Sequence, residues 1–128
     1  MNAKRLLKLA DHLDTVRPKA FDMRVWKSDC GTTACALGHA CDIPSFRRLG
    51  LKIEIETVIY SDGLVGHDQH FVMYGGNEGY DAADALFGIT RSESWCLFSN
   101  QRKGEKTETP KMVAKRIRKF VATGEVPA

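Results

Sequence analysis

Residues 29–41 read Asp29-Cys30-Gly31-Thr32-Thr33-Ala34-Cys35-Ala36-Leu37-Gly38-His39-Ala40-Cys41. This segment holds three of the four cysteines and one of the four histidines of the chain, and its middle is small and apolar. We interpret it as a buried central helix whose first turn presents Cys30. Asp29 or Thr32 is a suitable cap, because a short polar side chain accepts hydrogen bonds from the free backbone N–H groups of a first helical turn.

The segments on either side predict further helices and one hairpin. Residues 51–56 alternate strictly between apolar and charged, and Ile59 keeps the phase, which predicts a strand with one face in water. A returning strand is predicted at 67–74. Because two strands alone are marginal, we expect the hairpin to pack on the helices. Apolar spacing and end signals predict helices at Asn2–Val16, Ser45–Leu49 and Tyr80–Phe87, one opened by Thr90-Arg91-Ser92-Glu93, and a last one between Thr109-Pro110 and Gly124.

The predicted fold is therefore α+β, with about five helices packed around a central cysteine-bearing helix and a small antiparallel β-hairpin. A chain of 128 residues is expected to form a single domain, residues 1–128. Gly75-Gly76-Asn77-Glu78-Gly79 is interpreted as a tight turn, since glycine and asparagine supply the positive φ that turns need.

Composition and charge indicate which kinds of partner and which cellular compartment to expect. The formal charge of +3 permits an anionic partner without requiring one. No apolar run approaches the ~18 residues of a membrane span, so no membrane partner is expected. The N-terminal helix is charged and lacks the apolar core of a signal peptide. We therefore expect a cytoplasmic protein whose four cysteines are reduced.

A metal site is one candidate within the cysteine segment. Cys35 and His39 are four residues apart and would share a helical face, with Cys30 near the start of the same helix. Cys41 would point about 120° away from Cys35. Because no C-x-x-C or H-x-x-x-H pair is present, Cys30, Cys35 and His39 are kept only as an alternative zinc site, and no cofactor is predicted.

A cysteine nucleophile is a second candidate. At a helix N-terminus the dipole lowers the pKa of a thiol, and His67 or His70 on the returning strand could act as its base. Cys30 followed by these histidines resembles the papain-like plan of the NlpC/P60-type hydrolases. That resemblance implies Cys30 as the nucleophile. The sequence departs from the plan in having one hairpin where the family has a larger sheet, and no aromatic residue after the cysteine.

A basic face is the third candidate. Lys111, Lys115, Arg118 and Lys119 are expected along one side of the last helix, where they could bind the phosphates of a nucleic acid or a small anionic ligand. The alternative is a solvated face, because the apolar stripe opposite already accounts for the amphipathic pattern.

The motif Cys30-Gly31-Thr32-x-Ala34-Cys35-Ala36-x-Gly38-His39-Ala40 resembles a group of small uncharacterised bacterial and phage proteins with a CGTxACxxG[HW]A signature. The segment 85–90, Ala-Leu-Phe-Gly-Ile-Thr, fits the same group. The resemblance implies no activity or ligand. Since the group accepts tryptophan at the position of His39, it implies a packing role for this histidine.

Two functions follow from these observations. The first is a non-enzymatic cytosolic binding or regulatory domain, of phage or bacterial type, with a protein, nucleic acid or small anionic ligand as its partner. The alternative is a papain-like cysteine hydrolase with Cys30 as the nucleophile and His70 or His67 as the base.

Overall fold

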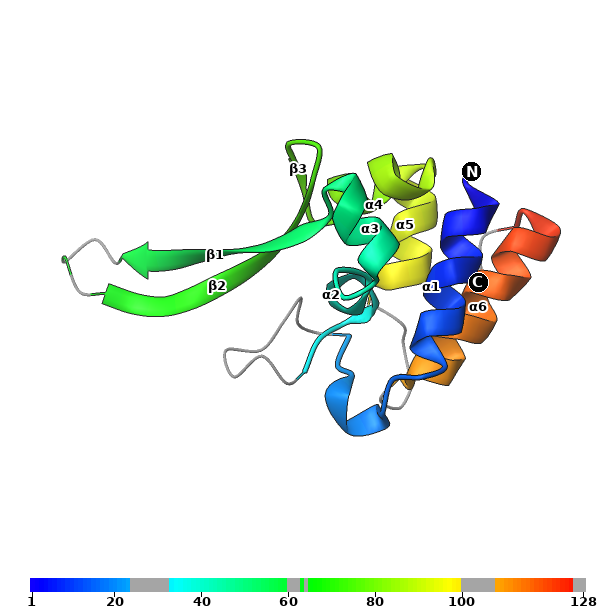
Figure 1. Cartoon of the computed structure of the whole chain (residues 1–128), viewed down its shortest axis with the longest axis horizontal. Coiled ribbons are helices and arrows are strands. Elements are labelled where there is room, and N and C mark those ends of the chain that lie inside the picture. Colours follow the sequence, from blue (N-terminus) through cyan, green and yellow to red (C-terminus); the bar gives the residue numbers. More distant parts are fainter. Residues whose placement is uncertain (24–32, 60–62, 64, 100–107, 126–128) are drawn as a thin grey trace.

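The computed structural model describes residues 1–23, 33–59, 63, 65–99 and 108–125, with only the backbone described at 58 and 65–68. Within these residues the chain forms six α-helices, one 3-10 turn and a three-stranded antiparallel sheet of order β1-β2-β3 (Figure 1). The predicted α+β class is confirmed. The elements are α1 (Ala3–Leu13), η1 (Pro18–Ala20), α2 (Ala36–Ala40), α3 (Pro44–Leu49), β1 (Lys52–Ile59), β2 (Val65–Tyr74), β3 (Asn77–Glu78), α4 (Tyr80–Phe87), α5 (Arg91–Phe98) and α6 (Pro110–Thr123).

The first and last helices, α1 and α6, lie side by side at one end of the molecule (Figure 1). Their apolar stripes face inward, so both helices are stabilised mainly by tertiary packing. Arg118 of α6 also binds α1, because its guanidinium donates hydrogen bonds to Asp11 at 2.9 Å and to Asp14 at 2.6 Å. The buried residues of the pair are Leu6, Leu9, Ala10, Leu13, Val113, Ala114, Ile117 and Phe120.

Phenylalanine rings link α3, α4 and α5. Phe87 at the end of α4 contacts Phe46 of α3 edge-on, at 6.0 Å between ring centroids, and Phe98 of α5 at 5.7 Å. The backbone N–H of Asn2 donates to the carbonyl of Phe87 at 2.6 Å. The start of α1 thereby satisfies a carbonyl at the end of α4, which would otherwise lack a partner within its own helix.

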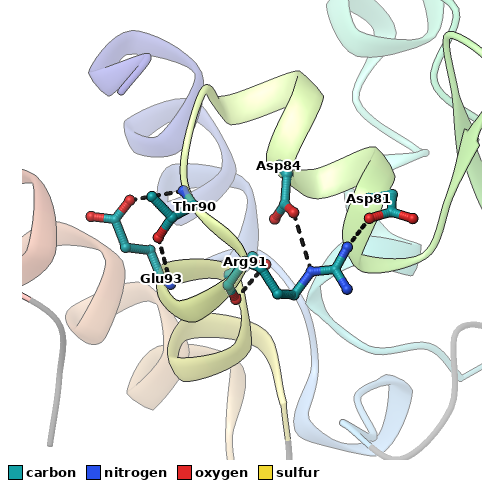
Figure 2. A network of polar contacts seen from close by, with 6 residues as sticks. Asp81, Asp84, Thr90, Arg91 and Glu93 are labelled. Carbon is teal, nitrogen blue, oxygen red and sulfur yellow. Dashed lines mark hydrogen bonds and ion pairs between the residues drawn. The ribbon is translucent and has the colours of Figure 1, made fainter.

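The joint between α4 and α5 is held by polar side chains (Figure 2). Thr90 and Glu93 form the predicted capping box: each side chain accepts a hydrogen bond from the other's backbone N–H, at 2.9 and 3.1 Å. Arg91 reaches back to α4, where its guanidinium binds Asp84 at 3.1 Å and also Asp81. The orientation of α5 relative to α4 is therefore fixed by contacts that the local sequence already encodes.

The two long strands, β1 and β2, form an arm that extends away from the helices (Figure 1). Their register runs from Lys52↔Met73 at the base to Ile59↔Val65 near the tip, with an irregularity between Thr57 and Ile59. At the base, Val72 is buried and Ile53 packs against the core. We use "the arm" below for residues 52–59 and 65–74. The expected packing of the hairpin on the helices is present at its base, and the outer part of the arm extends beyond them (Figure 1).

The predicted tight turn after β2 is present. Gly75 and Gly76 have φ of 57° and 83°, and β3 then pairs back on β2 through Tyr74↔Asn77. Both glycines are needed because L-residues with side chains rarely adopt these angles.

The cysteine segment differs from the prediction. The helix α2 covers only Ala36–Ala40, and Cys35 before it is extended, with φ −77° and ψ 179°. Ala34 forms a parallel bridge with Phe21: its N–H donates to Ala20 and its carbonyl accepts from Asp22. Because these backbone groups are used in pairing across the chain, they are not available to a helix. The predicted continuous helix from Cys30 to Cys41 is therefore wrong over its described first part.

Candidate functional site

The proposed nucleophile Cys30 lies outside the described residues, and so does any contact that it makes. Among the described residues, α2 begins at Ala36, with Cys35 as its N-cap. The lowered pKa expected of Cys30 therefore stays a prediction.

Cys35 is the thiol that does sit at this N-terminus, and it is only 3% exposed. Burial raises the pKa of Cys35 to about 11, and the nearby backbone N–H groups of Gly38 and Leu37 offset only part of that effect. At neutral pH Cys35 is a protonated thiol. Its environment is the opposite of the exposed, electropositive surroundings of reactive cysteines.

His39 is engaged in packing and in one strong hydrogen bond. Its Nε2 lies 2.6 Å from the carbonyl of Ala20, so this nitrogen carries the proton and donates. The ring stacks on Phe21 at 6.0 Å, and Nδ1 lies 3.8 Å from a carboxylate oxygen of Asp42. His39 therefore packs against Phe21 and binds the backbone at Ala20. Since Nε2 is occupied, His39 could offer only Nδ1 to the zinc ion of the alternative metal site.

Within the described part of the chain, no group of three or more His, Cys, Asp and Glu side chains is arranged to hold a metal ion. Of the three predicted zinc ligands, the structure describes Cys35 and His39. Cys41 is the C-cap of α2, and its Sγ donates to the carbonyl of Leu37 at 3.5 Å.

The two candidate bases both belong to β2 in the arm. His70 pairs with Ile55 of β1, three positions outward from the Lys52↔Met73 pair at the base. His67 lies still nearer the tip. The structure therefore places both histidines on the projecting part of the molecule. Two of the three described thiols, Cys35 and Cys41, are buried in the helical body, and Cys96 of α5 is partly exposed.

The basic face predicted on α6 is partly present. Lys111, Lys115 and Lys119 are exposed and recur every four residues, so they form one stripe along the helix. Arg118 does not belong to this stripe, because it is held by Asp11 and Asp14 of α1. These carboxylates also raise the pKa of Arg118.

The arm carries an exposed apolar face. Ile53 and Ile55 point to the same side of β1, because strand residues two apart share a face. Ile59 keeps this phase, because the register irregularity between Thr57 and Ile59 adds its extra residue to β2 and not to β1. Ile53 packs on the core, but Ile55 is 62% exposed and Ile59 is 69% exposed. The alternation in the sequence located this apolar face correctly. It could not show that the core ends after Ile53.

Charge is distributed unevenly between the arm and the last helix. The two strands of the arm contain one lysine and three acidic residues, whereas α6 contains five basic residues and no acidic one. On β1 the exposed carboxylates Glu54 and Glu56 point away from the apolar face, and Glu54 binds Lys52 at 2.9 Å. The molecule therefore presents an apolar and acidic arm at one end and a basic helix at the other (Figure 1).

Comparison with family models, with curated proteins and with solved structures found no match to the chain. None of the helices among the described residues has the length and hydropathy that crossing a membrane requires.

Proposed function

We propose that the chain is a non-enzymatic binding domain and that the arm is the element that contacts its partner. The observation that carries this proposal is the exposure of Ile55 and Ile59 on a projecting two-stranded element, in continuity with the buried face at Ile53. Fully burying an isoleucine side chain contributes ~1.5–3 kcal/mol. Because Ile55 and Ile59 are 62% and 69% exposed, together they offer a partner about 2–4 kcal/mol. A two-stranded ribbon is also marginal alone and gains stability when it is covered.

The chain offers a matched test, because three isoleucines share one face of one strand. Ile53→Thr removes a side chain that packs on the core, and we expect it to lower the free energy of unfolding by about 1–3 kcal/mol. The double change Ile55→Thr, Ile59→Thr keeps β-branched side chains and should alter this free energy by less than about 0.5 kcal/mol. Urea denaturation at protein concentrations low enough to keep the chain monomeric measures both, because association would itself add to the apparent stability. If the double variant loses as much stability as Ile53→Thr, the apolar face belongs to the fold and the proposal fails.

The alternative function, a hydrolase built on Cys30 with His70 or His67, makes a different prediction. It requires one thiol that reacts much faster than the others, at Cys30, with a pKa well below ~8.5. Alkylation followed by mass spectrometry, with Cys30→Ser as the control, measures this directly. Four slowly reacting thiols would remove the hydrolase and leave the binding domain.

The cytoplasmic location belongs to the same proposal and rests on the reduced state expected of the cysteines. Among the described residues, Cys35, Cys41 and Cys96 form no disulfide bond. Nucleic acid remains a candidate partner for the lysine stripe of α6, and its binding would weaken steeply with added salt.

A further inference from the structure

The exposed faces of the arm and of α6 complement each other. The stripe formed by Lys111, Lys115 and Lys119 is flanked by Met112, which is 43% exposed. Lysine side chains cover apolar surface with their aliphatic stems while the ammonium group stays in water. Such a helix face suits a strand that presents isoleucines on one side and carboxylates on the other.

We infer that the partner of the arm is a second copy of this chain, and that each arm lies along α6 of the other copy. This inference rests on the proposed function, since it requires the arm to be a contact surface. In Figure 1 the arm and α6 lie at opposite ends of the molecule, so the arm does not reach its own α6. Two copies placed side by side in opposite directions bring each arm to the other's α6. The result is a closed dimer with two equivalent contacts.

The spacings of the two elements agree. Ile55 and Ile59 are four strand residues apart, about 13 Å at 3.3 Å per residue. Lys111 and Lys119 are eight helical residues apart, about 12 Å at 1.5 Å per residue. Successive lysines of the stripe are therefore about 6 Å apart, close to the ~6.6 Å between Glu54 and Glu56.

The position of β1 in the sheet permits apolar contacts and ion pairs with the same helix at once. Because β1 is the edge strand of the sheet, no neighbouring strand separates its acidic side from its apolar side. Lysine stems can pack on Ile55 and Ile59 while their ammonium groups reach past the edge to Glu54 and Glu56. Lysine and glutamate at an edge also oppose uncontrolled strand pairing, which favours a contact through side chains.

Charge reversal with complementation tests the inference. One variant carries Glu54→Lys and Glu56→Lys, and a second carries Lys115→Glu and Lys119→Glu. Sedimentation of the wild-type chain should give twice the 14.3 kDa monomer mass, whereas each variant alone should dissociate at least about tenfold more readily. An equimolar mixture of the two variants should recover the dimer, because both contacts in the heterodimer pair lysine with glutamate.

Arg17→Glu with Lys19→Glu is the matched control. It makes the same change in net charge as the α6 variant at two exposed residues outside the arm and α6, and the dimer should persist. Circular dichroism checks that every variant folds. A wild-type chain that stays monomeric at all concentrations overturns the inference. A dimer whose dissociation is changed by neither charge-reversal variant also overturns the inference. A mixture of the two variants that fails to associate does so as well.

The experiments distinguish failure of the dimer from failure of the proposed function. If the wild-type chain is monomeric while Ile55→Thr with Ile59→Thr leaves stability unchanged, the arm remains a contact surface for another partner and only the dimer is wrong. If the wild-type chain is monomeric and binds nucleic acid, and Lys115→Glu with Lys119→Glu abolishes that binding, the stripe serves nucleic acid and the dimer is wrong.

Discussion

Cys35 illustrates how burial can outweigh a helix N-terminus in setting the chemistry of a thiol. The backbone N–H groups there favour the thiolate, yet the pKa of Cys35 rises from an ordinary 9.0 to about 11. From position at a helix N-terminus alone, the pKa of a cysteine is expected to be lowered. The difference is solvation, which depends on residues distant in the chain, such as Phe21 and Tyr80, and is therefore not visible in the local motif.

The raised pKa of Cys35 makes a prediction about alkaline stability. Between pH about 9 and about 11 the unfolded chain releases this proton while the folded chain keeps it, so stability falls as the pH rises through that range. The thiol's contribution is fully present below pH ~9, and about 3 kcal/mol is lost by pH 11. Urea denaturation of the wild-type chain and of Cys35→Ala across this range measures the difference. Equal pH slopes for the two would contradict the assignment.

Two arginines on α6 allow a similar comparison between buried and exposed ion pairs. Arg116 is 9% exposed, binds Glu108, and donates to the carbonyl of Leu97 at 3.0 Å. Arg118 is 40% exposed, and its aspartate partners are also accessible to water. We expect Arg116→Ala to lower the free energy of unfolding by about 3–5 kcal/mol, because it leaves the Glu108 carboxylate buried without this cation.

Exposed ion pairs contribute much less than buried ones, so Arg118→Ala should lower the same free energy by about 1 kcal/mol or less. The two residues lie on the same helix, so a difference in helix propensity does not separate the variants. Thermal or urea denaturation of both, measured in one buffer, gives the ratio. If both variants lower the free energy of unfolding equally, burial does not determine how much the Arg116–Glu108 ion pair contributes to stability.

The helices show where local sequence suffices to predict an element. The spans of α4 and α6 and the capping box of α5 agree with prediction, because each end is set by nearby residues such as Thr90, Thr109 and Gly124. The shortened α2 shows the opposite case. There the backbone of Ala34 forms hydrogen bonds with residues 20 and 22. The pattern of apolar residues within the segment cannot predict this pairing, because it depends on a distant part of the chain.

The arm is likewise only half predictable. Alternation of apolar and charged residues identifies the strand and its apolar face, and the observed register confirms a hairpin. Where the covering layer ends depends on the placement of the helices. Exposed Ile55 and Ile59 could therefore not be told from core residues by sequence alone. The sequence predicted the basic stripe of α6. It could not predict that Arg118 binds Asp11 and Asp14 of α1 and so does not belong to the stripe, because that contact forms only in the folded chain.

The assembled molecule separates a packed helical body from a projecting arm, and this separation is the basis of the proposed function. Few buried apolar contacts support the outer part of the arm, so its amides should exchange with solvent far faster than those of α1. A second copy that covers the arm would slow this exchange and would leave the interior of the body unchanged.

Hydrogen exchange of residues 52–59, followed by mass spectrometry over a series of protein concentrations, measures this effect, with residues 6–13 of α1 as the internal reference. We predict fast exchange in β1 at low concentration that slows as the chain associates, while exchange in α1 stays constant. Exchange in β1 that is as slow as in α1 at every concentration would contradict the account, since the arm would then be a rigid part of the fold. Exchange in β1 that is fast at every concentration would show that no second copy covers it.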